Sequence, residues 1–143
     1  MKEPVTVFSD EILIETKGNC DLINITEQVS GCVRDSKVSN GICTVFCVGS
    51  TGAVTTIEYE PGLLKDFPDA MERVAPRNAE YQHHLMWGDG NGHSHIRASV
   101  LGPSLTVPVI DGRLSLGTWQ QIVFADFDVR PRKRTIQVVI IGE

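Results

Sequence analysis

The segment Ile42-Cys43-Thr44-Val45-Phe46-Cys47-Val48 alternates in a way that is typical of a β-strand. Successive strand residues face opposite sides, so its even-numbered side chains point one way and Cys43, Val45 and Cys47 point the other. Because both sets are largely apolar, we expect this strand to lie in a sheet that is packed on both faces.

Similar β-branched and apolar runs occur on both sides of this segment. Asp111-Gly112 between two of them is typical of a two-residue hairpin turn, because Asp and Gly tolerate the positive φ angles that such a turn needs. The runs predict strands at 4–8, 11–16, 42–48, 53–59, 96–101, 105–110, 113–116, 121–128 and 135–141.

Two further segments have helical periodicity. The first begins near Asn24 or Thr26 and carries an apolar stripe formed by Val29, Cys32 and Val33. The second is short or broken, because Pro68 is tolerated only in a first turn, which we place after Asp66. Its apolar positions are Leu64, Phe67, Met71 and Val74.

Residues 76–94 show no periodicity, and a long connection of this kind is usually functional or mobile. The pattern as a whole predicts one α+β domain over residues 1–143, with mostly antiparallel strands and two or three short helices.

Composition narrows the classes of partner. The chain has 143 residues, 41% of them hydrophobic and 22% charged, which is typical of a globular protein. A formal net charge of -5 disfavours nucleic acid, whose binding depends on Lys and Arg. The start of the chain lacks the layout of a signal peptide, and the apolar runs are too short to span a membrane. We therefore expect a cytoplasmic protein with neither nucleic-acid nor membrane partners.

The four cysteines are Cys20, Cys32, Cys43 and Cys47, and no pair has the spacing of a zinc knuckle or a redox motif. On one strand, Cys43 and Cys47 would lie roughly 13 Å apart, which is too far for a disulfide. We expect reduced, structural cysteines.

All four histidines fall within the stretch from Tyr81 to His95. If His93 and His95 lie on a strand, both imidazoles project from one face and can bind one metal ion, with a third ligand from His83 or His84. Three imidazoles suit zinc and leave an open coordination position, whereas the plain alternative is loop histidines that bond the backbone.

The glycines around this stretch bear on the same prediction. Gly88, Gly90 and Gly92 would let the loop fold closely around a ligand. Between them, Asp89 and Asn91 supply either turn chemistry or a catalytic acid, base or supporting hydrogen bond.

Three other segments are candidates for substrate binding. Gly49-Ser50-Thr51-Gly52-Ala53 could hold a phosphate through Ser50, Thr51 and backbone N–H groups, although no P-loop lysine follows and such residues also form ordinary turns. Glu58 lies on the next predicted strand and is a candidate acid or base.

In Leu116-Gly117-Thr118-Trp119-Gln120-Gln121, Trp119 offers a flat apolar surface, or belongs to the core or an interface. Arg130-Pro131-Arg132-Lys133-Arg134 reads as a solvated basic hairpin. This turn, or Arg97 and Arg113, could instead bind a phosphorylated ligand.

Four segments resemble the YjbQ-like family over nearly the whole chain. They are GDGNGHSHIRAS (88–99), LGPSLTVPV (101–109), DGRLSLGTWQQIVFADFD (111–128) and VVIIGE (138–143). Members of this family are often described as secondary thiamine-phosphate synthases. The resemblance implies a β-sandwich core, a homotrimer and a divalent metal held by histidines. We expect this metal to be zinc, or magnesium for a diphosphate substrate.

Carried onto this chain, the family's metal histidines fall on His83, His93 and His95, and its tryptophan turn on Gly117 to Gln120, so that Thr118, Trp119 and Gln120 would contact substrate. His84 is then left over. Many relatives have a histidine followed by two hydroxyl residues where this chain has Gly49-Ser50-Thr51, so one possible base or ligand is missing here.

The resemblance implies a transferase that joins hydroxymethylpyrimidine diphosphate to a thiazole phosphate and releases pyrophosphate. Asp89 and Glu58 are its candidate catalytic residues, and Ser50, Thr51 and Arg97 could bind the phosphorylated metabolite. Two alternatives stay open: a metal-dependent hydrolase acting on a small phosphorylated metabolite, and a non-catalytic trimer that binds a metal or metabolite.

Overall fold

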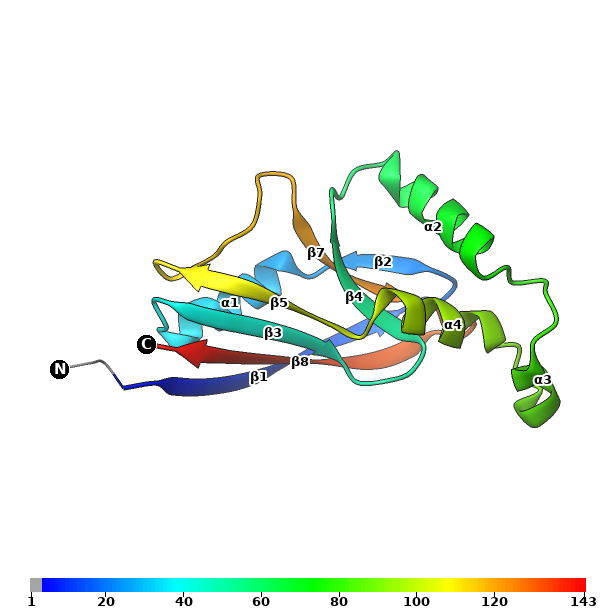
Figure 1. Cartoon of the computed structure of the whole chain (residues 1–143), viewed down its shortest axis with the longest axis horizontal. Helices are drawn as coiled ribbons and strands as arrows, with labels where there is room; N and C mark the ends of the chain where they lie inside the picture. The colour runs from blue at the N-terminus through cyan, green and yellow to red at the C-terminus, as the bar shows by residue number, and fades with distance from the viewer. Residues whose placement is uncertain (1–3) are drawn as a thin grey trace.

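The computed structural model describes residues 4–143, which form eight strands and four helices (Figure 1). In chain order these are β1 (Thr6–Thr16), β2 (Asp21–Asn24), α1 (Thr26–Ser36), β3 (Gly41–Cys47), β4 (Gly52–Ile57), α2 (Leu63–Val74), α3 (Gln82–Trp87), α4 (Gly92–Leu101), β5 (Ser104–Ile110), β6 (Arg113–Leu114), β7 (Gln121–Asp126) and β8 (Arg132–Gly142). The fold class is α+β, as the periodicity predicts. None of the helices in residues 4–143 is long and apolar enough to cross a membrane.

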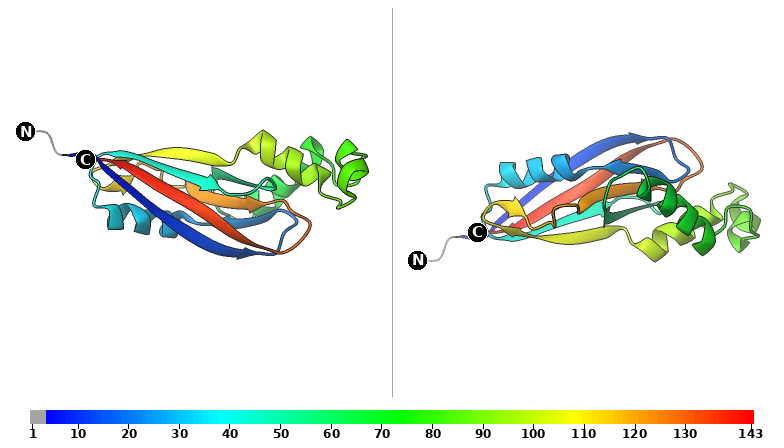
Figure 2. Two further views of the ribbon diagram at one scale, coloured as in Figure 1. Left: turned by 90° about the horizontal axis from the view of Figure 1, so that it is seen from below. Right: turned by 90° about the horizontal axis from the view of Figure 1, so that it is seen from above.

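Two antiparallel sheets form the framework (Figures 1 and 2). The larger sheet has the order β1-β8-β3-β5-β6 and the smaller one β2-β7-β4. The main core lies between them, with α1 closing it: Val29 and Val33 of α1 pack with Phe124 of β7 and Ile136 of β8. Against the other face of the smaller sheet, Phe127 and Ala53 pack with Met71 of α2 and Ala98 of α4. The smaller sheet is therefore covered on both faces.

The strand and hairpin predictions are largely confirmed. Positions 4–8 and 11–16 merge into the single strand β1, and the short strand β2 was not predicted. Asp111 and Gly112 have φ angles of 51° and 76°, and Ile110 pairs with Arg113 across them, as a two-residue hairpin requires. The first helix begins at Thr26, within the predicted start.

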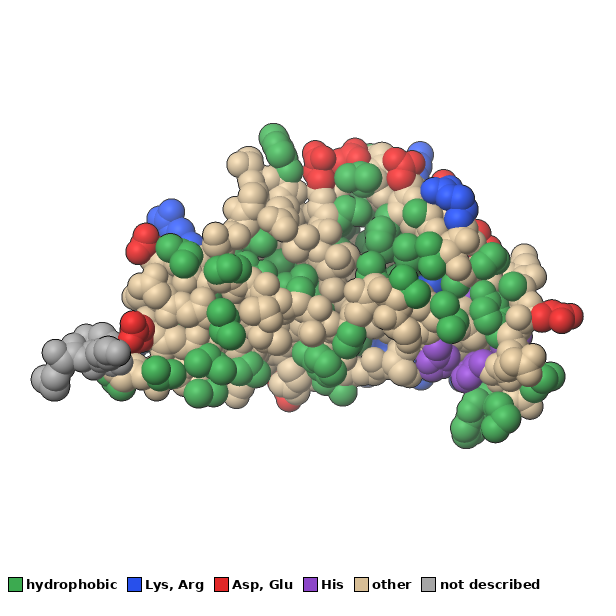
Figure 3. All heavy atoms as spheres, in the orientation of Figure 1, with side chains coloured by type: hydrophobic (Ala, Val, Ile, Leu, Met, Phe, Trp, Pro, Cys, Tyr) green, Lys and Arg blue, Asp and Glu red, His purple; other side chains and the backbone are tan. Residues whose placement is uncertain are grey.

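The alternation in β3 is confirmed, but the expectation that both faces are packed is wrong within one chain. Cys43, Val45 and Cys47 are fully buried, whereas Ile42 is 47% exposed and Phe46 is 43% exposed. Described residues cover only the inner face of the larger sheet, because α1 and the smaller sheet both lie on that side. Hydrophobic side chains consequently line the lower edge of the molecule in Figure 3.

The second helix is longer than expected, and Pro68 lies inside it rather than in its first turn. The helix begins early because both carboxylate oxygens of Glu60 accept hydrogen bonds, from Gly62 N at 2.8 Å and from Leu63 N at 2.6 Å. These bonds satisfy N–H groups that a helix start leaves without partners. A proline costs the helix one intrahelical hydrogen bond, and α2 nevertheless continues to Val74.

Residues 76–94 are not a long irregular connection, and 96–101 is not a strand. The segment contains α3 and the start of α4, which runs through Leu101. In α4 the buried positions after the first residue, Gly92, are His93, Ser94, Arg97 and Ala98, which share one helical face. Tertiary burial of this face outweighs the strand preference of the β-branched residues in the segment.

A buried ionic cluster joins the two sheets where β7 leaves the smaller one. Arg134 of β8 donates to both oxygens of Asp126 at 2.8 Å and to Thr51 Oγ1 at 2.6 Å. Asp128 accepts from Thr51 Oγ1 at 3.0 Å and lies 3.1 Å from the guanidinium of Arg132. The expectation of a solvated basic hairpin is therefore wrong for Arg134, which is only 8% exposed.

All four cysteines are free, as predicted, and Cys32, Cys43 and Cys47 are buried. Burial raises the pKa of the Cys43 thiol to about 12, so the reactive thiolate is scarce at neutral pH.

Asp128→Asn is expected to lower the free energy of unfolding at neutral pH by about 2 kcal/mol, because a buried charged acceptor is lost. Burial by itself would raise the pKa of Asp128, but hydrogen bonds from Arg130 N, Thr51 and Arg132 hold it below its ordinary value of 3.8. The stabilisation is then present above pH 3.8 and is lost as the pH falls through the folded-state pKa. Urea unfolding at pH 7 and at pH 3 measures this, and a difference between wild type and variant that does not shrink at pH 3 would contradict it.

Candidate metal centre

Three potential metal ligands meet at the end of the molecule where α3 and α4 lie. Donor atoms of His83, Asp89 and His95 all lie within 4.8 Å of one another. His83 Nε2 lies 3.0 Å from Asp89 Oδ1, and the rings of His83 and His95 have centroids 4.6 Å apart. The histidine atoms visible in Figure 3 lie at this end, beside protruding hydrophobic side chains.

Local sequence chemistry explains how the three side chains come together. Gly88 ends α3 in the left-handed conformation, with φ of 62°, and Gly90 reverses the chain again with φ of 71°. Between them, Asp89 Oδ1 accepts a hydrogen bond from Asn91 N at 3.0 Å. Asp89 therefore shapes the turn, as one of the two interpretations predicts, and it also contacts His83.

The start of α4 is fixed to the core by Asn91 and Ser94. Asn91 Oδ1 accepts from Ser94 Oγ at 2.9 Å and from Val129 N at 3.1 Å, while Ser94 Oγ also approaches Phe127 O at 2.6 Å. Because α4 is held in this way, His95 in its first turn has a defined position, in contrast to α3, none of whose residues is buried.

His93 does not join the cluster, and the strand argument for it is wrong. On a helix, residues two apart point about 200° away from each other, so His93 and His95 face different directions. His93 is 2% exposed and lies near the ring of Tyr81, with centroids 6.5 Å apart. Burial and the positive charges of Arg97 and Arg77 lower its pKa, which favours a neutral core histidine.

His84, the histidine left over in the family comparison, lies on the same side as His93. Its ring meets Tyr81 edge to face, with centroids 5.6 Å apart. His84 Nε2 and His93 Nδ1 are the two buried side-chain nitrogen or oxygen atoms within residues 4–143 that have no hydrogen-bond partner. Such atoms usually bond to ordered water in native proteins.

The donor set fits a divalent transition metal. Ligand atoms about 2.0–2.2 Å from a tetrahedral ion lie about 3.3–3.6 Å apart, so a separation within 4.8 Å needs only a small closure. Hydrogen bonds from the Asn91 backbone and His83 lower the pKa of Asp89, which keeps it an anionic donor at neutral pH. The side chains of His83 and Asp89 are 26% and 34% exposed, so a ligand can approach from solvent.

Of the predicted substrate residues, Thr51 is connected to the start of α4 through hydrogen bonds of Phe127. Phe127 N donates to Thr51 O, and Phe127 O accepts from Ser94 of α4. Ser50 is exposed, whereas Thr51 is buried and engaged by Asp128 and Arg134.

Gly49 precedes these residues with a φ angle of 145°. A Cβ at this position would lie 2.8 Å from Arg134 Nη1, so the buried arginine and the backbone both favour glycine. The guanidinium of Arg134, a residue that sequence reasoning placed in a solvated turn, thus occupies the space beside Gly49.

The remaining predicted residues lie elsewhere. Glu58 and Trp119 line one cavity together with Thr118, at the opposite end of β4 from Ser50. A six-residue strand spans about 20 Å, so Glu58 is not beside Ser50 and Thr51 as the predicted site requires. Gln120 has a structural part: it accepts from Gly117 N at 3.0 Å and donates to Thr56 Oγ1 at 3.1 Å.

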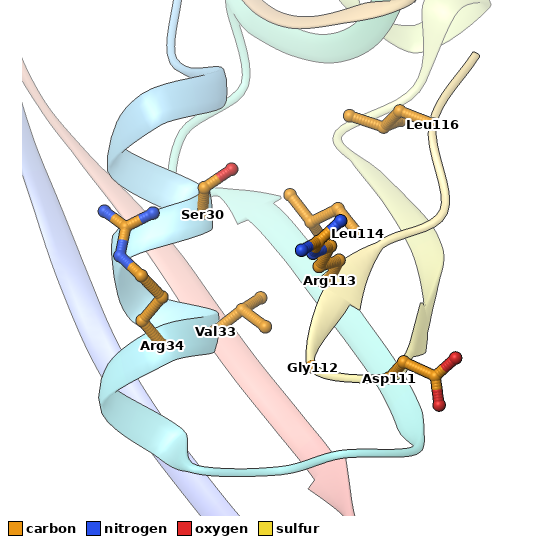
Figure 4. A pocket seen from close by; sticks show the side chains of 8 residues that line it. All are labelled: Ser30, Val33, Arg34, Asp111, Gly112, Arg113, Leu114 and Leu116. Atoms are coloured by element: carbon orange, nitrogen blue, oxygen red, sulfur yellow. The ribbon is translucent and has the colours of Figure 1, made fainter. Parts of the chain in front are cut away.

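Two arginines that were candidates for phosphate binding have different surroundings. Arg97 is 5% exposed and already donates to Ala75 O at 3.0 Å and to Glu72 at 2.7 Å. Arg113 lines a cavity of about 410 Å³ between α1 and the β5–β6 hairpin, where Arg34 forms the opposite wall (Figure 4). This cavity lies at the far end of the molecule from α3 (Figure 1).

Sequence comparison matches residues 10–143 to the model of the family described as UPF0047 protein YjbQ-like. The chain belongs to this family. A UPF0047 protein of Methanothermobacter thermautotrophicus is 43% identical over 137 residues, which cover 96% of this chain and 94% of the relative. The UPF0047 protein YugU of Bacillus subtilis is 33% identical over 130 residues, covering 90% of this chain and 96% of YugU.

Solved structures agree with this assignment. A YbjQ-like protein of unknown function from Sulfolobus solfataricus has a TM-score of 0.94 at 35% identity, covering 98% of this chain and all of its own. A hypothetical protein from Aeropyrum pernix has a TM-score of 0.88 at 31% identity, covering 94% of this chain and 98% of its own. The fold described above is thus the fold of YjbQ-like proteins.

Gly92→Ala is expected to destabilise the α3–α4 region, because the added Cβ would lie 2.5 Å from Tyr81 Cβ. Overpacking of this kind costs about 1–3 kcal/mol of unfolding free energy. Gly31→Ala in α1 is the control, since its Cβ would meet only ordinary contact at 3.6 Å. Thermal unfolding should show a lower melting temperature for Gly92→Ala alone, and equal melting temperatures would show that Tyr81 yields freely.

Proposed function

We propose that this protein is a divalent-metal-dependent enzyme acting on a small phosphorylated metabolite, with His83, Asp89 and His95 as its metal ligands. The observation that carries the proposal is the convergence of two imidazoles and one carboxylate within 4.8 Å. Three protein ligands with solvent access leave a coordination position for substrate or water, which is typical of catalytic rather than structural sites.

The donor chemistry favours zinc over magnesium. Imidazole suits zinc and other late transition metals, whereas magnesium prefers an oxygen shell that keeps several waters. When bound, such an ion supplies positive charge against the negative charge that develops on a departing phosphate or diphosphate. A hydrogen bond of 3.0 Å from Asn91 N positions Asp89, and the fixed first turn of α4 holds His95.

Ser50 is the predicted phosphate ligand that best suits this site. It is exposed and follows Gly49, and its neighbour Thr51 is joined through Phe127 to the start of α4. Glu58 is too far along β4 to share the substrate and Asp89 is assigned to the metal, so neither predicted catalytic residue serves as a free acid or base at this site. We accordingly assign phosphate binding to Ser50 and its turn.

Within this class, the family resemblance favours thiamine-phosphate synthesis, a transfer that releases pyrophosphate. The competing activity is hydrolysis of a phosphorylated metabolite, which the open metal position also favours. Incubating the zinc-loaded protein with hydroxymethylpyrimidine diphosphate and thiazole phosphate separates the two. Thiamine phosphate indicates the transferase, whereas free phosphate or hydroxymethylpyrimidine monophosphate without thiamine phosphate indicates the hydrolase.

Metal content is the direct test of the ligand set. Wild-type protein dialysed against zinc should retain about one ion per chain, and His83→Ala and His95→Ala should each lose it, since removing one of three protein ligands weakens zinc binding strongly. His84→Ala is the matched control because it neighbours His83 but lies outside the cluster. Elemental analysis measures all four proteins.

A further variant distinguishes between two candidates for the third ligand, Asp89 of the cluster and His93, which the family resemblance implies. His93→Gln should keep the metal if Asp89 is the third ligand and lose it if His93 is. A wild type that retains no zinc would remove the proposed centre altogether.

We further propose that the protein assembles as a homotrimer through the outer face of its larger sheet. An apolar row of cross-strand neighbours crosses this face, formed by Val7, Ile141, Ile42 and Pro108. Phe46, four residues after Ile42 on β3, lies on the same face. Val7 is 70% exposed. The outer face of an antiparallel sheet is usually polar when it meets solvent, so an apolar one indicates a protein partner.

Light scattering after size exclusion tests this assembly. Wild type should have three times the chain mass of 15.7 kDa, and Ile42→Lys/Phe46→Lys should elute as a folded monomer, because two charges cannot be buried without partners. Val74→Lys is the control, being half exposed on α2 and away from the sheet. A trimer that survives the double substitution would place the interface elsewhere.

A further inference from the structure

A second cavity lies at the end of β4 remote from Ser50, and the metal centre does not use it. Its volume is about 360 Å³, and its walls include Glu58, Tyr59 and Glu60 from the segment after β4 and Thr118 and Trp119 from the segment before β7. These two segments lie at the top of the molecule in Figure 1, whereas α3 lies at the lower right.

Aromatic rings supply the flat surfaces of this cavity. Trp119 is 72% exposed, although the turn that carries it is well fixed: Gln120 N donates to Gly117 O at 3.0 Å, and the Gln120 side chain bonds to both Gly117 and Thr56. Tyr59 is 38% exposed, and its hydroxyl donates to Leu22 O at 2.8 Å. Both rings are therefore held on anchored backbone while their faces stay available.

The charge of the cavity is negative. Glu60 is already engaged at the start of α2, but no hydrogen bond or ion pair from residues 4–143 engages the Glu58 carboxylate. The lining residues include no Lys, Arg or His. Figure 3 shows Asp and Glu side chains gathered where β4 leads into α2.

We propose that this cavity binds an organic cation, such as a quaternary ammonium group or a positively charged flat ring. The faces of Trp and Tyr rings attract cations through their quadrupole, and Trp is the strongest of them. A carboxylate without a partner at the same cavity adds direct charge attraction. An anionic ligand would instead meet Glu58 and Glu60 with no positive side chain to balance them.

This binding site is independent of the proposed metal centre. Glu58 and Trp119 were expected to serve one active site with Ser50, but β4 separates them by its own length of about 20 Å. The cation therefore binds with or without metal at His83, His95 and Asp89, so either proposal can fail while the other stands.

The test uses choline as the cation and 3,3-dimethylbutan-1-ol as its neutral counterpart of the same shape. In a Trp87→Phe background, Trp119 is the remaining tryptophan, so its fluorescence reports the cavity. Choline should change this fluorescence saturably and bind at least about fivefold more tightly than the alcohol, which reflects the cation–π contribution.

Variants then assign the binding to its residues. Glu58→Gln should weaken choline binding about three- to tenfold. Glu80→Gln removes an exposed carboxylate near α3 and should leave the affinity unchanged, and His95→Ala should do the same. Trp119→Leu lacks the fluorescent reporter, so its binding is measured by broadening of the choline methyl signal in proton NMR. This substitution should abolish the broadening.

Three results would overturn the inference. The alcohol could bind as tightly as choline, which would make the cavity merely apolar. Glu58→Gln could leave choline affinity unchanged, which would remove the carboxylate from the site. A blue-shifted, concentration-dependent Trp119 emission without any response to choline would show that a second copy of the chain covers the ring.

Discussion

The buried pairing of Arg134 with Asp126 is the interaction on which the arrangement of this protein depends. Asp126 ends β7 of the smaller sheet and Arg134 lies on β8 of the larger one, so their two hydrogen bonds hold the sheets in register at that end. A buried charge without a partner costs several kcal/mol, and this cost makes the pairing obligatory. Through Thr51 and Asp128, the same cluster fixes the turn after β3 and the segment after β7, against which α4 begins.

The sequence revealed the sheets well because alternation is a local signal. A buried strand such as β3 needs apolar residues at every second position whatever surrounds it, and the Asp111-Gly112 turn needs residues that accept positive φ. The alternation of β3 does not indicate which of its two apolar faces is buried within the same chain. Ile42 and Phe46 are as apolar as core residues, yet both side chains stay partly exposed within residues 4–143. Alternation alone does not distinguish a core face from an outer face.

Prediction failed where local preference and tertiary contact disagree. The residues Ile96 and Val100 favour a strand, but Asn91 and Ser94 tie the preceding turn to Val129 and Phe127 and the chain continues as a helix. Because the segment is a helix and not a strand, His93 points into the core and His95 faces His83. The pairing of His83 and His95 was foreseeable from their clustering, whereas the choice of Asp89 over His93 depended on the true element type.

The predicted site residues Ser50 and Glu58 lie at opposite ends of β4. A strand fixes the distance between its ends, so groups at Ser50 and at Glu58 cannot meet on one small molecule unless that molecule spans about 20 Å. The two ends also differ in composition: the Ser50 end carries an exposed hydroxyl next to Thr51, which contacts the buried Arg134, whereas the Glu58 end combines aromatic side chains with a carboxylate that no described residue engages. Within one chain, this separation along a rigid strand favours two separate ligand sites over one extended active site.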